Sequence, residues 1–489
     1  MEKEQTLLAR ARAYEREHFA AHGDERPLLH LTPPVGWMND PNGLCRYQGR
    51  YHLFFQYYPY STVWGPMHWG HAVSDDLLTW EYLPCALAPD SQADAQGCFS
   101  GSAVETAEGL MLVYTGVPSP ERQTQCMALG DGVDFVKYDG NPIIDPDELP
   151  TEYSRQDFRD PKVWREQDGY RMAVGSRHGE RSGTILLLEG ADARHWRLLG
   201  EVDSGRMRYG RMWECPDFFP LDGRQVLVVS PQEMQETELF HQGYNAIALI
   251  GDFDGRQFNR RSIQPVDQGF DFYAPQTVLA PDGRRLMIGW MENWDYCKKT
   301  PRTHPWYGQM SLPREIHLQN GRLIQQPARE IEQYWQNTVC VKDTLVRNFQ
   351  KYPQISGRAL DMTLGFSPAE EACRSVTVTL AADDTRETRL TCDFVRKELI
   401  FDRRKSGGVP EAFALHRVAV PELDARCALR IILDRESVEI FLNEGERAFS
   451  YRIFTPREAR DIRFAADGKL CMQCTAHLLS REIKPGENA

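Results

Sequence analysis

A repeat of about 60 residues is the feature that most constrains how this chain folds. Five short apolar runs with strand character each begin one or two residues after a turn glycine: "YHLFFQY" after Gly49, "LMLVYTG" after Gly109, "YRMAVGS" after Gly169, "QVLVVSP" after Gly223 and "RLMIGWM" after Gly283. These glycines are 60, 60, 54 and 60 residues apart. Such regular spacing predicts a unit of about four strands that occurs five times, as the blades of a radial β-propeller do.

Polar residues in distinctive motifs stand about nine residues before each of these glycines. They are Asp40 in "MNDPNG", Ser100 in "FSGSA", Asp160 in "FRDPK", Glu214 in "WECPD" and Tyr273 in "DFYAPQ". Taken singly, each is an ordinary turn or strand-end residue. Taken together, they occupy one equivalent position in every unit, and equivalent positions of a propeller converge on its axis. Three carboxylates are therefore expected in one central funnel, where they repel each other unless a ligand or a reaction uses them.

The repeat ends after residues 308–327, and the sequence pattern changes. A helix-like stretch, "AREIEQYWQN", covers residues 328–337, and beyond Val341 short runs alternate apolar and polar residues as an antiparallel sandwich does. The charged N-terminus reads as a surface helix. With 489 residues, the chain is too long for one ordinary core. The sequence thus predicts an all-β protein: an N-terminal helical extension over 1–28, a five-bladed β-propeller catalytic domain over 29–335 and a C-terminal β-sandwich over 341–489.

Charge and hydropathy disfavour several classes of partner. The formal net charge is −13, which repels nucleic acid backbones. No segment approaches the roughly 20 apolar residues that span a bilayer. The first 19 residues also lack the apolar core of a secretory signal. The 12 cysteines are scattered without framework spacing, as in a reducing compartment. We therefore expect a cytoplasmic protein without nucleic acid or membrane partners.

Three features that suggest ligand sites have simpler interpretations. Cys471 and Cys474 lack the second ligand pair of a zinc site, so buried thiols in a strand are favoured. His68 and His71 lie in a strand-like run, where residues i and i+3 face opposite sides. The basic run over residues 402–408 is interpreted as a solvated turn between strands, with a binding patch as the less favoured alternative. No metal site is predicted.

The three in-phase carboxylates suit glycoside cleavage. One carboxyl attacks or activates water, a second protonates the leaving oxygen, and a third stabilises positive charge on the sugar. Asp40 lies in a predicted turn rich in donors, which favours its ionised form. Glu214 stands between Trp213 and Cys215, where partial desolvation favours the protonated form. Asp160 is the third member of this set. A cysteine hydrolase built on Cys215 would need a paired histidine, which no motif supplies.

Further residues near the anchors are candidates for substrate binding. Hydrogen-bonding groups and aromatic faces are the two kinds of side chain that such a cleft needs. The predicted set is Trp37, Asn39, Gln56, Trp64, Phe99, Ser100, Arg159, Tyr273 and Trp290.

The motifs "WMNDPNG", "FSGS", "FRDPK" and "WECPD" resemble the signature motifs of glycoside hydrolase family 32, which holds invertases, fructanases and sucrose-6-phosphate hydrolases. The resemblance runs from about Leu31 to the end, and residues 433–454 are similar to the sandwich domain of that family. It implies a five-bladed propeller with a β-sandwich, retention of configuration, and neither metal nor organic cofactor. By motif match, Asp40 would be the nucleophile, Glu214 the acid/base and Asp160 the transition-state stabiliser.

Within the family, the stretch over residues 68–90 and the N-terminal helix resemble the bacterial sucrose-6-phosphate hydrolases. The expected substrate is sucrose, sucrose 6-phosphate or a short fructo-oligosaccharide. A fructan exo-hydrolase and a fructosyltransferase stay open as alternatives, as does a carbohydrate-binding propeller without activity. A homo-oligomer is also left open.

Overall fold

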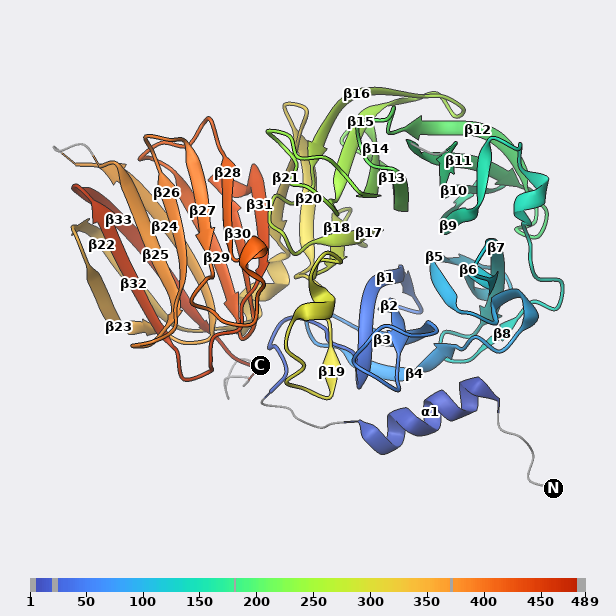
Figure 1. Ribbon diagram of the computed structural model, residues 1–489, viewed down its shortest axis with the longest axis horizontal. Coiled ribbons are helices and arrows are strands. Elements are labelled where there is room, and N and C mark those ends of the chain that lie inside the picture. Colours follow the sequence, from blue (N-terminus) through green and yellow to red (C-terminus); the bar gives the residue numbers. More distant parts are fainter. Residues whose placement is uncertain (1–5, 20–24, 180–181, 370–372, 482–489) are drawn as a thin grey trace.

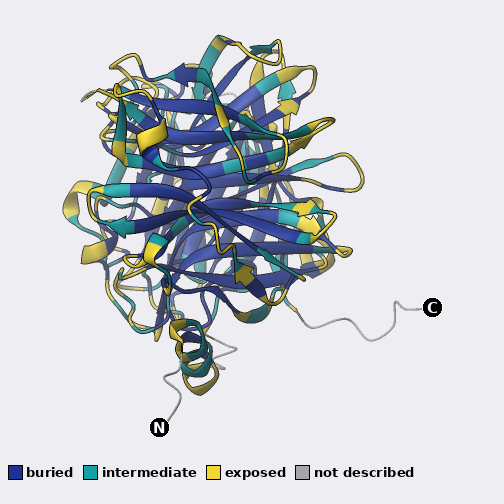
Figure 2. Ribbon diagram, turned by 90° about the vertical axis from the view of Figure 1, so that its right-hand side faces the viewer, coloured by how far each residue is buried: buried dark blue, intermediate teal, exposed yellow. Residues whose placement is uncertain are grey.

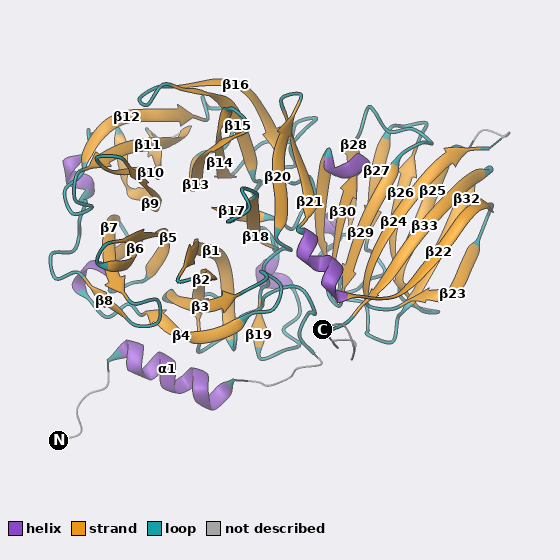
Figure 3. Ribbon diagram, turned by 180° about the vertical axis from the view of Figure 1, so that it is seen from behind, coloured by secondary structure: helices purple, strands orange, loops and turns teal. Residues whose placement is uncertain are grey.

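The computed structural model describes residues 6–19, 25–179, 182–369 and 373–481. These residues are almost entirely strands and loops, with one α-helix and a few short 3₁₀ helices (Figure 3). The prediction of an all-β protein is confirmed. None of the helices in this described part has the length and apolar character that a membrane crossing requires.

The expected N-terminal helix is α1, Leu7–His18, while residues 1–5 and 20–24 lie outside the described part. Thr6 caps it, because its Oγ1 accepts a hydrogen bond from the backbone N–H of Ala9 at 3.2 Å. The helix lies against strand β4 (Glu81–Leu87): Glu15 is buried and accepts from the N–H of Cys85 at 3.0 Å, and Arg12 donates to the Cys85 carbonyl at 2.9 Å. One side of the helix is therefore fixed on the edge of the first sheet.

Five sheets follow one another along the first two-thirds of the chain and surround a common centre (Figure 1). The first contains β19 (Trp306–Tyr307), β1 (Gly36–Tyr47), β2 (Arg50–Tyr58), β3 (His68–Ser74) and β4 (Glu81–Leu87). The second contains β5 (Cys98–Thr106), β6 (Gly109–Ser119), β7 (Arg122–Gly130) and β8 (Phe135–Lys137). The third contains β9 (Tyr153–Glu166), β10 (Gly169–His178), β11 (Ser182–Gly190) and β12 (Arg197–Ser204).

The fourth sheet contains β13 (Met212–Leu221), β14 (Arg224–Gln232), β15 (Ile247–Phe253) and β16 (Phe258–Pro265), and the fifth β17 (Tyr273–Leu279), β18 (Arg285–Trp290), β20 (Arg314–Gln319) and β21 (Arg322–Pro327). The first strands of successive sheets contact one another, and β17 contacts β1 in turn. Separate apolar clusters fill the spaces between neighbouring sheets, so buried residues occupy the interiors and exposed ones the loops (Figure 2).

Each of the five first strands carries one extra residue at the same place. The pairing of β1 with β2 shifts between Met38 and Pro41, and equivalent shifts occur at Ser100, at Asp160, just after Glu214 and just after Tyr273. Three of these bulges contain a proline and Pro41 borders a fourth, and proline lacks the N–H that a regular ladder would need. The repeated motifs of the sequence are thus repeated bulges, which turn a side chain out of the regular pleat.

The last third of the chain forms two six-stranded sheets. One contains β22 (Trp335–Val346), β33 (Leu470–Leu479), β24 (Ala359–Pro368), β29 (Ala428–Asp434), β30 (Ser437–Leu442) and β31 (Arg447–Arg452). The other contains β23 (Gln350–Ser356), β32 (Asp461–Asp467), β25 (Ser375–Ala382), β26 (Thr388–Asp393), β27 (Glu398–Asp402) and β28 (Leu415–Ala419). A single apolar cluster with residues from both sheets lies between them. This is the expected sandwich arrangement.

The helix expected over residues 328–337 is only partly present. A 3₁₀ helix covers Arg329–Tyr334, and strand β22 begins at Trp335. Ile331 and Tyr334 are buried three residues apart, which suits a 3₁₀ turn, and Trp335 then pairs with Leu479 in the sheet. Tertiary pairing overrides the helical spacing here.

A seam of buried charges joins the sandwich to the fifth sheet and its preceding loop. Arg314 contacts Asp267 at 2.9 Å and Glu439 at 2.6 Å, and all three side chains are buried. Arg403 contacts Asp271 at 2.6 Å. The solvated turn predicted over residues 402–408 is therefore wrong for Arg403, which is 1% exposed. The sequence pattern did not reveal its partner on the other domain.

Candidate active site

A cavity of about 580 Å³ is lined by residues of the first four sheets and of the loops beside them. Nine of the predicted site residues line it: Asn39, Asp40, Gln56, Trp64, Phe99, Ser100, Arg159, Asp160 and Glu214. Trp37, Tyr273 and Trp290 do not line it and are buried behind its wall. The three predicted carboxylates thus face one cavity from three different sheets.

Asp40 is held by two donors. Ser100 donates to Oδ2 at 2.7 Å, and the Asn39 amide donates to Oδ1 at 3.1 Å. The residue lies in the bulge of β1, so the turn expected around it is in fact part of a strand. Burial and then the negative charge of Glu214 raise the pKa of Asp40, while both hydrogen bonds oppose that rise. Its ionised form therefore depends on Ser100 and Asn39.

Asp160 has a left-handed backbone conformation, with φ of 66°. Such a conformation is uncommon outside glycine and follows from the bulge of β9. The Asp160 N–H donates to Thr115 at 2.9 Å, and its carboxylate accepts from the N–H of Cys215 at 2.9 Å. Burial and the nearby charge of Glu214 raise the pKa of Asp160, against the opposing effect of Arg159.

Glu214 lies between two donors. Arg159 donates to Oε1 at 2.9 Å, and the Tyr273 hydroxyl donates to Oε2 at 2.6 Å. The side chain is 14% exposed and opens to the cavity. Trp213, its neighbour in sequence, packs into the apolar cluster between the third and fourth sheets instead of against it. Glu214 is oriented by a guanidinium and a phenol, each of which fixes one carboxyl oxygen.

The thiol of Cys215 connects the carboxylates. Its Sγ lies 3.5 Å from Oδ2 of Asp40 and 3.5 Å from Oδ2 of Asp160. Burial and the charges of these carboxylates raise the pKa of Cys215 well above its usual value. The group therefore stays a thiol that can donate weakly to the carboxylates, and its environment is the reverse of the one that activates a cysteine nucleophile.

The three predicted residues outside the cavity support it from behind. Trp37 donates to the side-chain oxygen of Asn39 at 2.7 Å, and Tyr273 holds Glu214. Trp290 is fully buried and packs against Trp294, with ring centroids 4.8 Å apart. Trp294, in the loop after β18, lines the cavity in the place expected for Trp290.

Several lining residues had no sequence signal. Asp157 accepts from Arg159 at 2.8 Å and pairs with Arg177 at 3.0 Å, which links the guanidinium beside Glu214 to a second one. The others come mostly from loops or strand ends outside the repeated motifs: Pro120, Gln123, Gln156, Arg211, Met212, Gln232, Glu233, Tyr244 and Lys298. Within the described ranges, no cluster of three or more His, Cys, Asp or Glu side chains has an arrangement that could hold a metal ion.

Comparison with known proteins gives evidence on the family of this chain that does not depend on the geometry of the cavity. The model of the glycosyl hydrolases family 32 N-terminal domain matches residues 30–327, and that of the family 32 C-terminal domain matches residues 329–484. A sucrose-6-phosphate hydrolase of Escherichia coli is 38% identical over 464 residues, covering 91% of this chain and 93% of its own. A raffinose invertase of Escherichia coli is 36% identical over 460 residues, covering 90% and 92%.

Solved structures are similar over nearly the whole chain. The sucrose-6-phosphate hydrolase of Lactobacillus gasseri has a TM-score of 0.83 at 27% identity, covering 97% of this chain and 96% of that one. The family 32 β-fructofuranosidase BmSUC1 of Bombyx mori, solved as a mutant in complex with sucrose, has a TM-score of 0.81 at 31% identity, covering 96% and 98%.

Proposed function

This chain belongs to glycoside hydrolase family 32, and from that premise we propose that it hydrolyses the β-fructofuranosyl bond of sucrose or sucrose 6-phosphate. The observation that carries the proposal is the meeting of Asp40, Asp160 and Glu214 in one cavity, each held by its own hydrogen-bond donors. The two Escherichia coli relatives, whose names give sucrose 6-phosphate and raffinose as substrates, support a sucrose-type substrate.

We propose that the five sheets around the cavity are the blades of a β-propeller, and that the division into an extension over 1–28, a propeller over 29–335 and a sandwich over 341–489 holds. The contact of β17 with β1 and the apolar clusters between neighbouring sheets support this arrangement. Five equivalent bulges then aim their side chains at one axis. The cytoplasmic location expected from the sequence remains a prediction.

The proposed mechanism is a double displacement. Asp40 attacks the anomeric carbon of the fructosyl unit while Glu214 protonates the departing oxygen, and a covalent fructosyl-enzyme forms. Glu214, now a base, takes a proton from the water that releases fructose. Asp160 stabilises the positive charge that develops on the ring in both steps. Ser100 and Asn39 keep Asp40 ionised against its burial, and Arg159 with Tyr273 aims Glu214.

The substrate can be tested with sucrose, sucrose 6-phosphate, kestose and inulin side by side. We expect a higher kcat/KM on sucrose 6-phosphate than on inulin, with cleavage from the fructose end, because sugar that enters a bacterial cell can arrive phosphorylated. Chromatography of the released sugars gives the answer. Efficient inulin cleavage without any gain from the phosphate would favour a fructan exo-hydrolase. Transfer of fructose to sugar in preference to water would favour a fructosyltransferase.

The stereochemistry tests the double displacement. Two inversions give net retention, so the first product should be β-fructofuranose before it equilibrates. A retaining pair of carboxyl groups lies about 5 to 5.5 Å apart, and an inverting pair roughly 6.5 to 9.5 Å apart. Proton or carbon NMR recorded within the first minutes distinguishes the two anomers. An initial α product would contradict the assignment of Asp40 as nucleophile.

A further inference from the structure

A second set of polar side chains lies in the first strands of the five sheets, just past the bulges. In each strand, one of the first two residues after the bulge is polar and is buried or nearly so. These residues are Asn42 in β1, Ser102 in β5, Lys162 in β9, Asp217 in β13 and Gln276 in β17. They belong to the same five sequence motifs as the anchor residues, but the mechanism gives them no role.

Side chains of this set join the first strands to one another. Ser102 links β5 to β9, because its hydroxyl donates to the Pro161 carbonyl at 2.7 Å. Gln276 links β17 to β1 and to β5: it accepts from the N–H of Leu44 at 3.1 Å and donates to the Gly101 carbonyl at 2.8 Å. The strands that carry the anchor residues are therefore tied together by side chains as well as by packing.

The link between β9, β13 and β17 centres on Asp217. The Nζ of Lys162 lies 3.2 Å from Oδ1 of Asp217, and the N–H of Thr277 donates to Oδ2 at 2.6 Å. Asp217 is fully buried and the Lys162 side chain is 14% exposed, so water screens the ion pair little. Burial lowers the pKa of Arg285 and the charge of Asp217 opposes this effect, so a second cation lies near the carboxylate.

The same two strands hold catalytic carboxyls a few residues earlier in the chain. Asp160 precedes Lys162 in β9, and Glu214 precedes Asp217 in β13. Asp160 and Glu214 repel each other when both are ionised, and the charge of Glu214 adds to the effect of burial on the pKa of Asp160. Lys162 and Asp217 have opposite charges and attract. Their ion pair therefore opposes the separation of β9 and β13 that the catalytic carboxyls favour.

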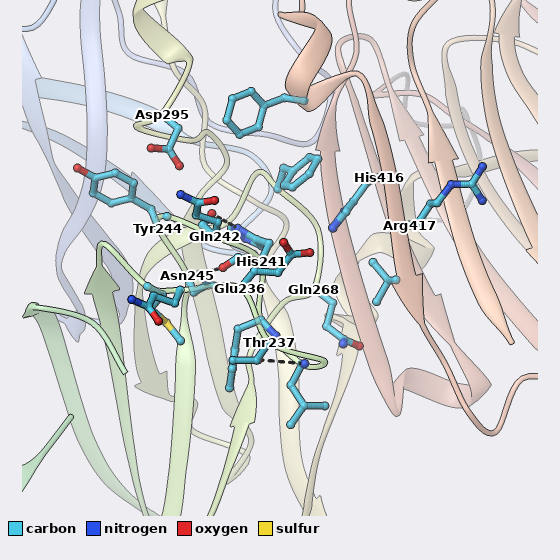
Figure 4. Close-up of a pocket in the computed structure, with 18 of the residues that line it drawn as sticks. Glu236, Thr237, His241, Gln242, Tyr244, Asn245, Gln268, Asp295, His416 and Arg417 are labelled. Atoms are coloured by element: carbon cyan, nitrogen blue, oxygen red, sulfur yellow. Dashed lines mark hydrogen bonds between the residues drawn. The ribbon is translucent and has the colours of Figure 1, made fainter. Parts of the chain in front are cut away.

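Neither member of this ion pair is placed to touch a substrate. Lys162 and Asp217 do not line the active-site cavity. They do not line the larger groove either, which has a volume of about 940 Å³ and lies between residues 233–245 and the sandwich (Figure 4). Any effect of the pair on the reaction must therefore act through the positions of β9 and β13.

We propose that Lys162 and Asp217 are positioning residues, whose ion pair fixes the distance between the carboxyl groups of Asp160 and Glu214. The inference rests on the proposed function for the roles of these two carboxyls, but the distance itself can be measured without a substrate. Catalytic groups must be held within about 0.5 Å of their productive positions, and a displacement of about 1 Å can cost about 100-fold in rate.

Lys162→Met removes the cation and keeps much of the length of the side chain. The substrate is sucrose or sucrose 6-phosphate, whichever the wild type cleaves faster. We expect kcat to fall by about 10- to 100-fold and KM to change by less than about threefold, because the loss affects the placement of reacting groups more than binding.

Lys137→Met is the matched control. The Lys137 side chain is 17% exposed and pairs with the fully buried Asp94 at 2.7 Å, but it does not line the cavity. This variant should lose stability, while kcat well below its unfolding temperature should stay within about twofold of the wild type, because no catalytic group moves. Equal losses of kcat in the two Lys→Met variants would contradict the inference.

A double variant separates positioning from stability. Lys162→Met alone leaves the charge of Asp217 less compensated, so the unfolding temperature should fall. Adding Asp217→Asn removes that charge, and the amide oxygen can still accept from the N–H of Thr277. The unfolding temperature should then rise again, while kcat should stay low because nothing offsets the repulsion between Asp160 and Glu214. If kcat recovers together with stability, the pair only stabilises the fold and the inference is wrong.

Crystal structures of the wild type and the double variant give a test without turnover. The distance between the carboxyl carbons of Asp160 and Glu214 should increase by more than about 0.5 Å in the variant. An unchanged distance would overturn the inference, whatever the kinetics show. If the wild type cleaves neither sucrose nor sucrose 6-phosphate, the proposed function fails, and the change in distance still decides whether the ion pair positions these two carboxyls.

Discussion

Removal of the Glu214 carboxyl should separate the two chemical steps. With sucrose, Glu214→Ala should lower kcat by about 10² to 10⁴, the usual contribution of a general acid–base group. With β-fructofuranosyl fluoride, whose leaving group needs little protonation, the first step should lose much less. The second step should remain slow, because no base activates water. Azide needs no base, so it should speed turnover and give fructosyl azide with retained configuration, which NMR and mass spectrometry identify.

Asp40→Ala is the matched variant. It has no nucleophile with which to form a covalent intermediate, so kcat should fall on the order of 10⁴-fold or more and azide should give no retained product. Circular dichroism and the unfolding temperature establish that the fold is intact. A retained azide product from Asp40→Ala, with none from Glu214→Ala, would mean that the two roles are reversed.

Asp160→Asn should behave differently from both. Its amide keeps much of the shape and accepts from the N–H of Cys215 through its oxygen, but it lacks the charge that stabilises a cationic sugar ring. Rates should therefore fall by about 10² to 10³ with good and poor leaving groups alike.

The central part of the site could be predicted from the sequence because the same β-bulge recurs in the first strand of each sheet. Each first strand has a bulge next to its anchor residue, and a bulge tolerates proline where a regular strand does not. The pairs Asp40–Pro41 and Asp160–Pro161 are therefore visible as motifs, and their period locates them in equivalent strands. A β-bulge that recurs in the backbone therefore appears as a recurring motif in the sequence.

Contacts between segments that are far apart along the chain produced no such motif. The donors to Glu214 are Arg159 and Tyr273, which are 55 and 59 residues away along the chain, so its neighbours in sequence do not reveal them. Trp290 ends strand β18 and points into the core, while Trp294 in the following loop reaches the cavity. Strand register and the path of a loop decide which of two nearby tryptophans lines a cavity. Neither can be derived from the amino-acid composition.

The seam between the two parts of the molecule is the second place where a large effect is expected. Arg314 is fully buried and donates to Asp267, to Glu439 and to the Ser450 hydroxyl at 2.9, 2.6 and 2.6 Å. Burial alone would raise the pKa of Glu439, but Arg314 and His30 together lower it below its usual value. The Glu439 carboxylate is thus ionised although it is fully buried, and it depends on this guanidinium.

Arg314→Met should destabilise the protein by about 3 to 5 kcal/mol, because breaking a buried pair leaves uncompensated charge behind. We expect the unfolding temperature to fall by roughly 3 to 5 °C, measured by calorimetry or circular dichroism, because the entropy of unfolding of a 489-residue chain is about 1 kcal/mol per degree. Sucrose cleavage well below that temperature should change little, since Arg314 does not line the cavity. A second substitution, Glu439→Gln, should restore part of the loss, because it removes charge that Arg314 no longer neutralises.

Arg329→Met is the control for the loss of an arginine as such. Arg329 also pairs with a glutamate, Glu315, at 2.8 Å, but its side chain is 63% exposed, so water screens the pair. Its loss should cost about 1 kcal/mol or less. If Arg314→Met and Arg329→Met shift the unfolding temperature equally, the buried seam contributes no more than a surface pair. If Glu439→Gln lowers stability further in the Arg314→Met background, the charge left on Glu439 is compensated by His30 alone, and the dependence on Arg314 inferred from the contacts is wrong.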